Sequence, residues 1–270
     1  MSIWNESKDN VWVAAHRGWS EKYPENTMEA YKAAVALGVD QLEIDVRVTA
    51  DNELVLIHDA SVDRTTDGTG LVREKTLAEL KALDAGSWKG EQFRGCRIPS
   101  FEEFMDYVKD LPDMTVDFEL KEYPVGDNEA VAYDVCDRVL QAIIDIGWQD
   151  KCIINTFSPI LHEYIQDKYG PMFRQHVYFP LHCHNRPDRG ECTRDPYTYG
   201  YSVCMFGEPN MASQEDFDRL RDTYGIRCWA GAAVKDEATV DEAIAKGSEL
   251  ITCNNPDVVL DLLRKKGYHK

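Results

Sequence analysis

Residues 42–48 of this chain read LEIDVRV, a short strand pattern in which two chemical kinds of side chain alternate. Successive side chains of a β-strand point to opposite faces, so the aliphatic residues share one face and must pack against helices. Glu43 and Asp45 share the other face. Isolated charges inside a protein are strongly disfavoured unless they are paired or bound to a metal ion. The segment therefore predicts a strand with an apolar outer side and an acidic inner side.

On both sides of this segment, short apolar strands alternate with amphipathic helical stretches, which is typical of repeated βα units. About eight such units are present, which favours a (β/α)8 TIM barrel, with a doubly wound open sheet as the alternative. We expect one domain over residues 1–270, with a small excursion about residues 59–99 that is rich in Thr, Asp and Gly. The predicted strands are 11–15, 42–49, 54–57, 115–121, 152–155, 177–179, 203–206, 226–229 and 250–252, and the predicted helices are 26–37, 128–146 and 159–169, with others from 213, 236 and 256.

Helix starts are marked by capping boxes, in which a small polar residue precedes a Glu by three positions. Thr76 with Glu79 and Ser100 with Glu103 predict two helix starts. The spacing of Asn26 and Glu29 predicts a third, with Asn26 as the cap.

A second acidic strand follows at residues 115–121, where Asp117, Glu119 and Lys121 share one face. This face could belong to a solvent-exposed edge strand, or Lys121 could form a salt bridge with a carboxylate. Two such strands in one βα array favour an inward-facing acidic cluster, because unpaired buried charge is rare.

Two histidines end strands beside these carboxylates. His16 ends the first predicted strand, and His58 follows the strand 54–57. Barrel enzymes carry their active groups at the C-terminal ends of the strands. A lone histidine is usually a structural hydrogen-bonding residue, but two at the same rim indicate acid/base chemistry.

Taken in order, several short segments resemble the signature of the glycerophosphodiester phosphodiesterase family. The match is dense over residues 11–121. Each piece is weak alone, whereas the ordered set is highly specific. The segments are Ala15-His16-Arg17-Gly18, Pro24-Glu25-Asn26-Thr27, Leu42-Glu43-Ile44-Asp45-Val46, His58-Asp59, Arg64-Thr65-Thr66 and Phe118-Glu119-Leu120-Lys121.

The resemblance implies a TIM barrel that hydrolyses glycerophosphodiesters, such as glycerophosphocholine or glycerophosphoethanolamine, to glycerol 3-phosphate and an alcohol. It also implies that the glycerol 2-hydroxyl attacks phosphorus. The implied roles are acid and base for His16 and His58, metal binding for Glu43, Asp45 and Glu119, and substrate contacts for Arg17, Lys121, Glu25 and Trp229. The later half departs from the family pattern, because Trp229-Ala230-Gly231-Ala232 keeps only the tryptophan of a Trp-Thr-Val-Asn sequence.

The proposed ligands are all carboxylates. A set without thiolate or imidazole selects a hard cation, so we expect one Mg²⁺ or Ca²⁺ ion. A competing metal hypothesis concerns His182, Cys183, His184 and Cys192, whose spacing fits no standard zinc template and indicates a loop.

Charge and composition narrow the remaining possibilities. The net charge of −18 disfavours nucleic acid and stable association with anionic membranes. No signal peptide or apolar span is evident, and the eight scattered cysteines suggest free thiols, so we expect a cytoplasmic protein. Two alternatives stay open: a non-catalytic barrel that binds glycerol phosphates, and a phospholipase D-like enzyme of the same fold.

Overall fold

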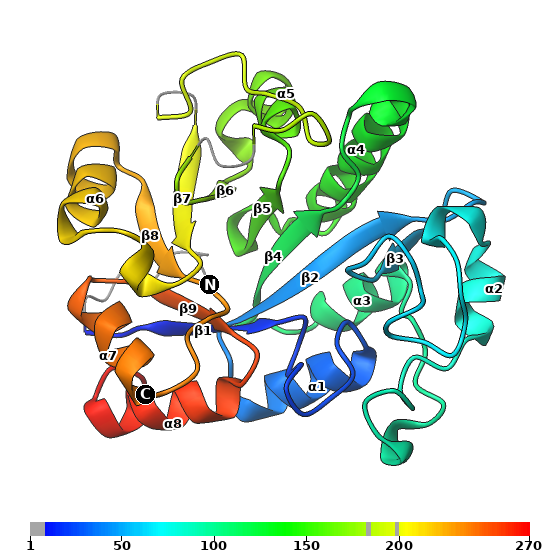
Figure 1. Ribbon diagram of the computed structural model, residues 1–270, viewed down its shortest axis with the longest axis horizontal. Coiled ribbons are helices and arrows are strands. Elements are labelled where there is room, and N and C mark those ends of the chain that lie inside the picture. Colours follow the sequence, from blue (N-terminus) through cyan, green and yellow to red (C-terminus); the bar gives the residue numbers. More distant parts are fainter. Residues whose placement is uncertain (1–8, 182–184, 198–199) are drawn as a thin grey trace.

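The computed structural model describes residues 9–181, 185–197 and 200–270. Within them, eight strands pair in parallel and close into a barrel in the order β1-β9-β8-β7-β6-β5-β4-β2, with β2 also paired to β1 (Figure 1). The TIM-barrel prediction is confirmed, and the open-sheet alternative fails because β1 pairs with both β2 and β9. The barrel strands are β1 (Trp12–His16), β2 (Gln41–Val48), β4 (Thr115–Leu120), β5 (Cys152–Thr156), β6 (Gln175–Tyr178), β7 (Tyr201–Phe206), β8 (Arg227–Ala230) and β9 (Leu250–Cys253).

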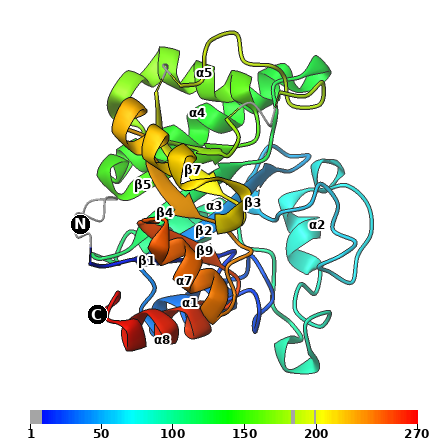
Figure 2. The ribbon, with the colours of Figure 1, turned by 60° about the vertical axis from the view of Figure 1, so that its left-hand side comes forward.

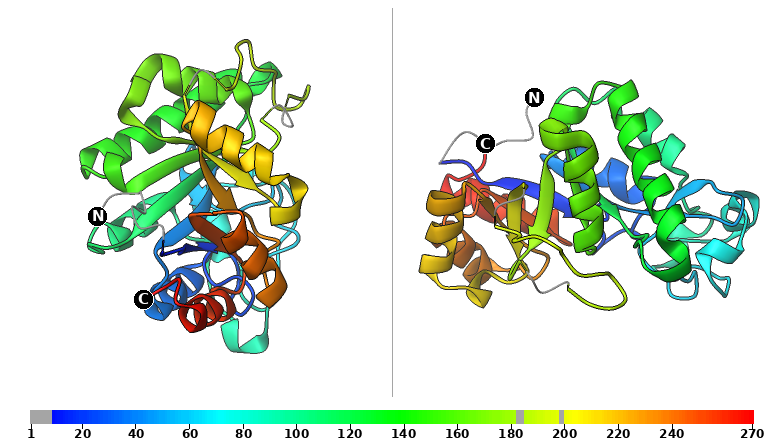
Figure 3. Two further views of the ribbon diagram at one scale, coloured as in Figure 1. Left: turned by 90° about the vertical axis from the view of Figure 1, so that its left-hand side faces the viewer. Right: turned by 90° about the horizontal axis from the view of Figure 1, so that it is seen from above.

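Helices cover the outside of the barrel, and the C-terminal helix α8 lies beside α1 (Figures 1 and 3). The capping boxes of Thr76 and Ser100 form as predicted, at the starts of α2 and α3. The helices are α1 (Met28–Leu37), α2 (Leu77–Ala82), α3 (Phe101–Val108), α4 (Glu129–Asp145), α5 (Pro159–Tyr169), α6 (Gln214–Asp218), α7 (Glu237–Ala245) and α8 (Pro256–Lys266).

A hairpin arm interrupts the βα alternation between β2 and β4. Strand β3 (Leu54–Leu56) runs antiparallel to β2, and the chain then makes an excursion that carries α2 before it returns at α3. Figure 2 shows this excursion as a separate lobe at the side of the barrel. The hairpin carries His58 back to the rim at which β1 and β2 end, and thus positions it for the site.

The aliphatic face of β2 packs as the sequence predicts. Leu42 and Ile44 are fully buried in the same core as Tyr31 of α1 and Phe104 of α3, whose rings meet edge to face with centroids 4.9 Å apart. Burying a side chain of this size contributes roughly 1.5–3 kcal/mol, so these contacts fix the strand's register. The opposite, inward face then has to hold Glu43 and Asp45.

Several sequence predictions are wrong in detail. Asn26 does not cap α1; Thr27 does, and its hydroxyl accepts from the amide of Ala30. Asn26 instead takes a left-handed backbone conformation, with φ 54°, and donates to Asp45. Strands β6 and β7 each begin two residues earlier than predicted, and β6 includes the buried polar residue His176.

Candidate active site

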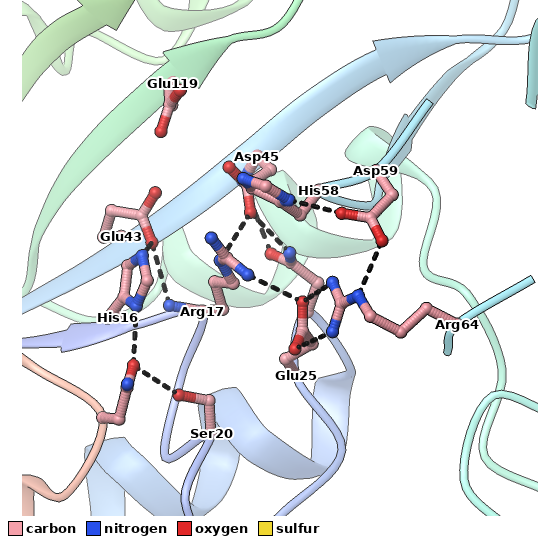
Figure 4. Close-up of polar contacts among 12 residues, drawn as sticks. His16, Arg17, Ser20, Glu25, Glu43, Asp45, His58, Asp59, Arg64 and Glu119 are labelled. Carbon is pink, nitrogen blue, oxygen red and sulfur yellow. Dashed lines mark hydrogen bonds and ion pairs between the residues drawn. The ribbon is translucent and has the colours of Figure 1, made fainter. Parts of the chain in front are cut away.

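The C-terminal rim of the barrel gathers the acidic and basic residues that the sequence singled out. Figure 4 shows His16 and His58 facing a carboxylate cluster formed by Glu43 and Asp45 of β2 and Glu119 of β4. One oxygen of each carboxylate lies within 4.8 Å of the others, and all three residues are buried. The register that pairs Asp45 with Glu119 brings the two strands' acids to the same height.

A pocket of about 220 Å³ lies over this cluster, and a concave site with convergent polar groups can bind a small ligand. Its walls combine the charged groups of β1, β2 and β4 with aromatic and small residues of the opposite strands. The lining residues are His16, Arg17, Glu43, His58, Asp117, Glu119, Lys121, Phe157, His176, Tyr178, Met205, Gly207, Gly231, Ala232, Ala233 and Thr252.

Glu43 is the least compensated acid of the cluster. Its Oε2 accepts from the amide of Arg17 at 2.9 Å, while its buried Oε1 has no hydrogen-bond partner among the described residues. Burial, followed by repulsion from Asp45 and Glu119, raises the pKa of Glu43 well above its usual value. A nearby cation would reverse that effect, because positive charge favours the ionised form.

Asp45, by contrast, is held ionised by two cations. Its carboxylate lies 3.0 Å from the ammonium of Lys121 and 3.2 Å from the guanidinium of Arg17, and it accepts from the Asn26 amide at 2.7 Å. Burial acts to raise the pKa of Asp45, but Lys121 and Arg17 outweigh burial and hold the pKa below its usual value.

Lys121 joins the two acidic strands. Its ammonium group also pairs with Glu119, and the side chain is almost completely buried. Burial would lower the pKa of Lys121, yet Asp45 and then Glu119 raise it above its usual value, so the lysine stays charged. The salt bridge that the sequence left as an alternative for Lys121 therefore exists inside the cluster.

The carboxylates fit a hard divalent cation. Glu43, Asp45 and Glu119 supply only oxygen ligands, which Mg²⁺ and Ca²⁺ prefer. Arg17 and Lys121 are two cations against these three acids, and Glu43 Oε1 lacks a partner among the residues described. The cluster can thus accept further positive charge.

Each histidine is oriented by a hydrogen bond at its Nδ1 atom. His16 Nδ1 lies 2.6 Å from Asn254 Oδ1, and His58 Nδ1 lies 2.6 Å from Asp59 Oδ1. Burial, and then the charge of Arg17, lower the pKa of His16 to about 4. The pKa of His58 is also lowered, by burial first and Lys121 second, and Asp59 opposes this shift.

A chain of charged residues links the two histidine loops (Figure 4). Arg17 donates to Glu25 at 2.9 Å, and Arg64 donates to both oxygens of Glu25 at 2.8 Å. Arg64 also donates to Asp59 at 2.6 Å, and Asp59 in turn holds His58. Glu25 therefore reaches the site through the two arginines rather than by lining the pocket.

Local backbone geometry explains the residues that follow β1. Arg17 has φ 58°, an uncommon conformation for a residue with a side chain, which places its amide on Glu43. Gly18 has φ 77°, and a Cβ atom there would lie 2.7 Å from the carbonyl carbon of Ala30. Only glycine fits this close approach of the loop to α1.

Comparison with known proteins places the chain in a family. A sequence model described as the glycerophosphoryl diester phosphodiesterase family matches residues 16–182, more than half of the chain. The chain belongs to this family. A glycerophosphodiester phosphodiesterase of Caldanaerobacter subterraneus subsp. tengcongensis is 42% identical over 147 residues, which cover 54% of this chain and 58% of that protein. One of Bacillus subtilis is 41% identical over 108 residues, 37% of each. The matches thus span 58% and 37% of the length of these two relatives.

Solved structures of the family share the fold. A glycerophosphodiester phosphodiesterase from Agrobacterium tumefaciens has a TM-score of 0.74 at 24% identity and covers 92% of this chain and 98% of its own. A phosphodiesterase from Oleispira antarctica, solved in complex with the product sn-glycerol-3-phosphate, has a TM-score of 0.77 at 23% identity, with 94% and 96% covered.

The pocket wall opposite β1 and β2 contains aromatic residues that the sequence did not single out. Tyr178 stacks on Phe157 with ring centroids 4.5 Å apart, and both line the pocket.

Trp229, which the sequence did name, lies in the barrel interior and is 2% exposed. It packs edge to face against His176 and does not line the pocket. His176 was also missed, although Asp117 on the acidic face of β4 gave a signal for it. A buried carboxylate needs a partner, and His176 is the partner of Asp117.

The remaining sequence hypotheses concern a metal loop and membranes. His182, Cys183 and His184 lie outside the described residues, and the thiol of Cys192 accepts from the Asn185 amide at 3.1 Å. Among the residues described, Glu43, Asp45 and Glu119 are the group that could hold a metal ion. None of the described helices is long and apolar enough to cross a membrane.

Proposed function

We propose that this chain hydrolyses glycerophosphodiesters, such as glycerophosphocholine or glycerophosphoethanolamine, to sn-glycerol 3-phosphate and an alcohol. The observation that carries the proposal is the pair of histidines, His16 and His58, that approach one buried carboxylate cluster from two different strand ends. A barrel that only bound glycerol phosphates would need the cations but not two histidines whose Nδ1 atoms are each fixed by a partner.

Glu43, Asp45 and Glu119 would hold one Mg²⁺ or Ca²⁺ ion. When bound, such an ion supplies positive charge that stabilises the negative oxygens of the phosphoryl group. Arg17 and Lys121 face the same space and add two permanent charges to bind the phosphodiester.

The surroundings of the two histidines favour different roles. His16 donates from Nδ1 to Asn254, and with a pKa of about 4 it is neutral at neutral pH, so its Nε2 lone pair can accept a proton. Asp59 can stabilise a protonated His58. We therefore assign His16 as the base that deprotonates the glycerol 2-hydroxyl and His58 as the acid that protonates the leaving alkoxide. The internal attack gives a cyclic phosphate, which water then opens.

The metal assignment is tested by binding and turnover together. Wild-type protein should take up Mg²⁺ or Ca²⁺ in calorimetry and lose hydrolysis of glycerophosphocholine in excess EDTA. Glu43→Gln should bind the ion far more weakly, because a charged ligand becomes a weak neutral one. Glu163→Gln is the matched control, because Glu163 is also a buried acid but binds the 193–194 loop. Full turnover in excess EDTA would contradict the metal assignment.

A further inference from the structure

A second buried polar pair lies in the barrel, directly across from His16. His176 of β6 and Asp117 of β4 have side-chain exposures of 0% and 1%, and His176 Nδ1 lies 2.9 Å from Asp117 Oδ2. In the closed strand order, β6 is four strands from β1 in either direction. The pair thus forms the pocket wall opposite His16, and the proposed acid/base chemistry assigns it no role.

Asp117 fixes which nitrogen of His176 carries the hydrogen. A neutral imidazole has one donor and one acceptor nitrogen, so the contact of Nδ1 with the Asp117 carboxylate leaves Nε2 as the acceptor. Nε2 is buried and has no hydrogen-bond partner among the described residues. The fully buried His162 differs, since its two nitrogens contact Gln175 at 2.7 Å and the Thr156 carbonyl at 3.1 Å.

The surroundings of His176 define the chemistry of a ligand. His176 lines the pocket beside Met205 and Tyr178, and the ring of Trp229 lies 5.7 Å from the His176 ring. This wall combines apolar side chains with the Tyr178 hydroxyl and with two buried acceptors that have no partner among the described residues, His176 Nε2 and Asp117 Oδ1. It suits a carbon chain that ends in a hydroxyl donor, because an acceptor that stays unpaired in such a place is costly.

We propose that His176, held in place by Asp117, accepts a hydrogen bond from the terminal hydroxyl of the glycerol moiety and so selects substrates whose glycerol is unacylated. This inference rests on the proposed function. In this proposal the phosphate binds at Arg17 and Lys121, and the glycerol carbon farthest from phosphorus extends to the wall that holds His176. An acyl ester at that oxygen has no hydrogen to donate and adds bulk against Met205 and Tyr178 of the same wall.

Binding measurements test this inference without requiring turnover. Calorimetry with Mg²⁺ present compares sn-glycerol 3-phosphate with propane-1,2-diol 1-phosphate, the same molecule without the terminal hydroxyl. Wild type should bind the first ~5- to 100-fold more tightly, the range expected when a buried acceptor loses its donor. Equal affinities for the two ligands would overturn the inference, and this outcome depends on no variant.

Three variants separate the hydrogen bond from packing. His176→Asn keeps a donor for Asp117 but is too short to reach the ligand, so the affinity ratio should fall to near one. His176→Gln places an amide near the Nε2 position and should restore part of the ratio. Met205→Leu changes an apolar residue of the same wall and should leave the ratio as in wild type.

The failure of this inference and that of the proposed function give different results. An unchanged ratio in folded His176→Asn, with glycerophosphocholine still hydrolysed, would refute only the role of His176. Absence of hydrolysis of any glycerophosphodiester, with the ratio still dependent on His176, would refute only the proposed function.

Discussion

Arg64 offers a sensitive test of how the site is held together, because it lies outside the pocket and touches both histidine loops through carboxylates. Arg64→Met keeps the aliphatic stem and removes three charge-assisted hydrogen bonds, two to Glu25 and one to Asp59. The Arg64 side chain is 45% exposed, so each bond contributes less than the ~1.5–3 kcal/mol of a buried one. We expect unfolding by urea to show a loss of about 1–3 kcal/mol.

Activity should fall along with stability. Asp59 would lose its second anchor, and the imidazole of His58 would be less well oriented, so kcat/KM should fall ~10- to 100-fold, as for other residues that orient an active group. The matched control is Arg94→Met, since Arg94 makes a similar paired contact with Glu91 in the same excursion but is 66% exposed. That variant should lose under ~1 kcal/mol and keep its activity. Unchanged kcat/KM in Arg64→Met, or an equal loss in Arg94→Met, would refute the reasoning.

The loss of stability in Arg64→Met should depend on pH. Desolvation acts to raise the pKa of Glu25, but Arg64 and Arg17 outweigh it, so the pKa of Glu25 is lowered. Arg64 also lowers the pKa of Asp59 to about 2, against the opposing effect of burial. Acids whose pKa is lower in the folded protein stabilise it above their unfolded pKa values, about 4. That stability is lost as the pH falls through the folded values. The stability difference between wild type and Arg64→Met should therefore shrink between pH 5 and pH 2.

Four further predictions follow from the site. His16→Ala and His58→Ala should each lower kcat/KM by ~10²–10⁴, and a variant with near-wild-type turnover would remove that histidine from the chemistry. The pH profile of kcat/KM should be bell-shaped, with its acidic limb below the usual histidine value of about 6.5, because the pKa of His16 is about 4; a flat profile would contradict acid/base catalysis. A glycerophosphocholine analogue with hydrogen at the glycerol 2-position should bind ~0.5–1.5 kcal/mol more weakly and turn over slower by ~10⁵ or more; comparable rates would mean that water attacks phosphorus directly. Gly18→Ala should cost over ~2 kcal/mol in urea unfolding, since its Cβ would meet Ala30 at 2.7 Å, whereas Gly95→Ala, with φ 91° and nothing within 4 Å, should cost only the ~1–2 kcal/mol of backbone strain; equal losses would contradict the steric account.

The barrel could be predicted because its strands follow a period of two with one helix-packed face. Leu42 and Ile44 marked the outer face of β2, and the placement of Glu43 and Asp45 followed from that alternation alone. Strand β6 was harder to delimit, because it opens with polar residues that look like part of a loop. Their burial depends on partners far away in the sequence, above all Asp117 beside His176.

Asn26 shows a different limit of sequence reasoning. The spacing to Glu29 favours a helix cap, and a local pattern cannot reveal that Asp45, 19 residues away, needs a buried donor. The sequence likewise does not reveal that the carboxylate of Glu25 binds Arg17 and Arg64, and the substrate contact implied for Glu25 stays a prediction. These hydrogen bonds and ion pairs join segments far apart in the sequence, so they become visible only in the folded barrel.

The central claim is that the chain cleaves a glycerophosphodiester on the alcohol side of phosphorus. The most direct measurement incubates the protein with glycerophosphocholine and Mg²⁺ or Ca²⁺ and quantifies all products by ³¹P NMR and a choline assay. We predict sn-glycerol 3-phosphate and choline in equal amounts, with neither formed in EDTA. Release of phosphocholine and glycerol, or no release from any glycerophosphodiester with either cation, would contradict the account.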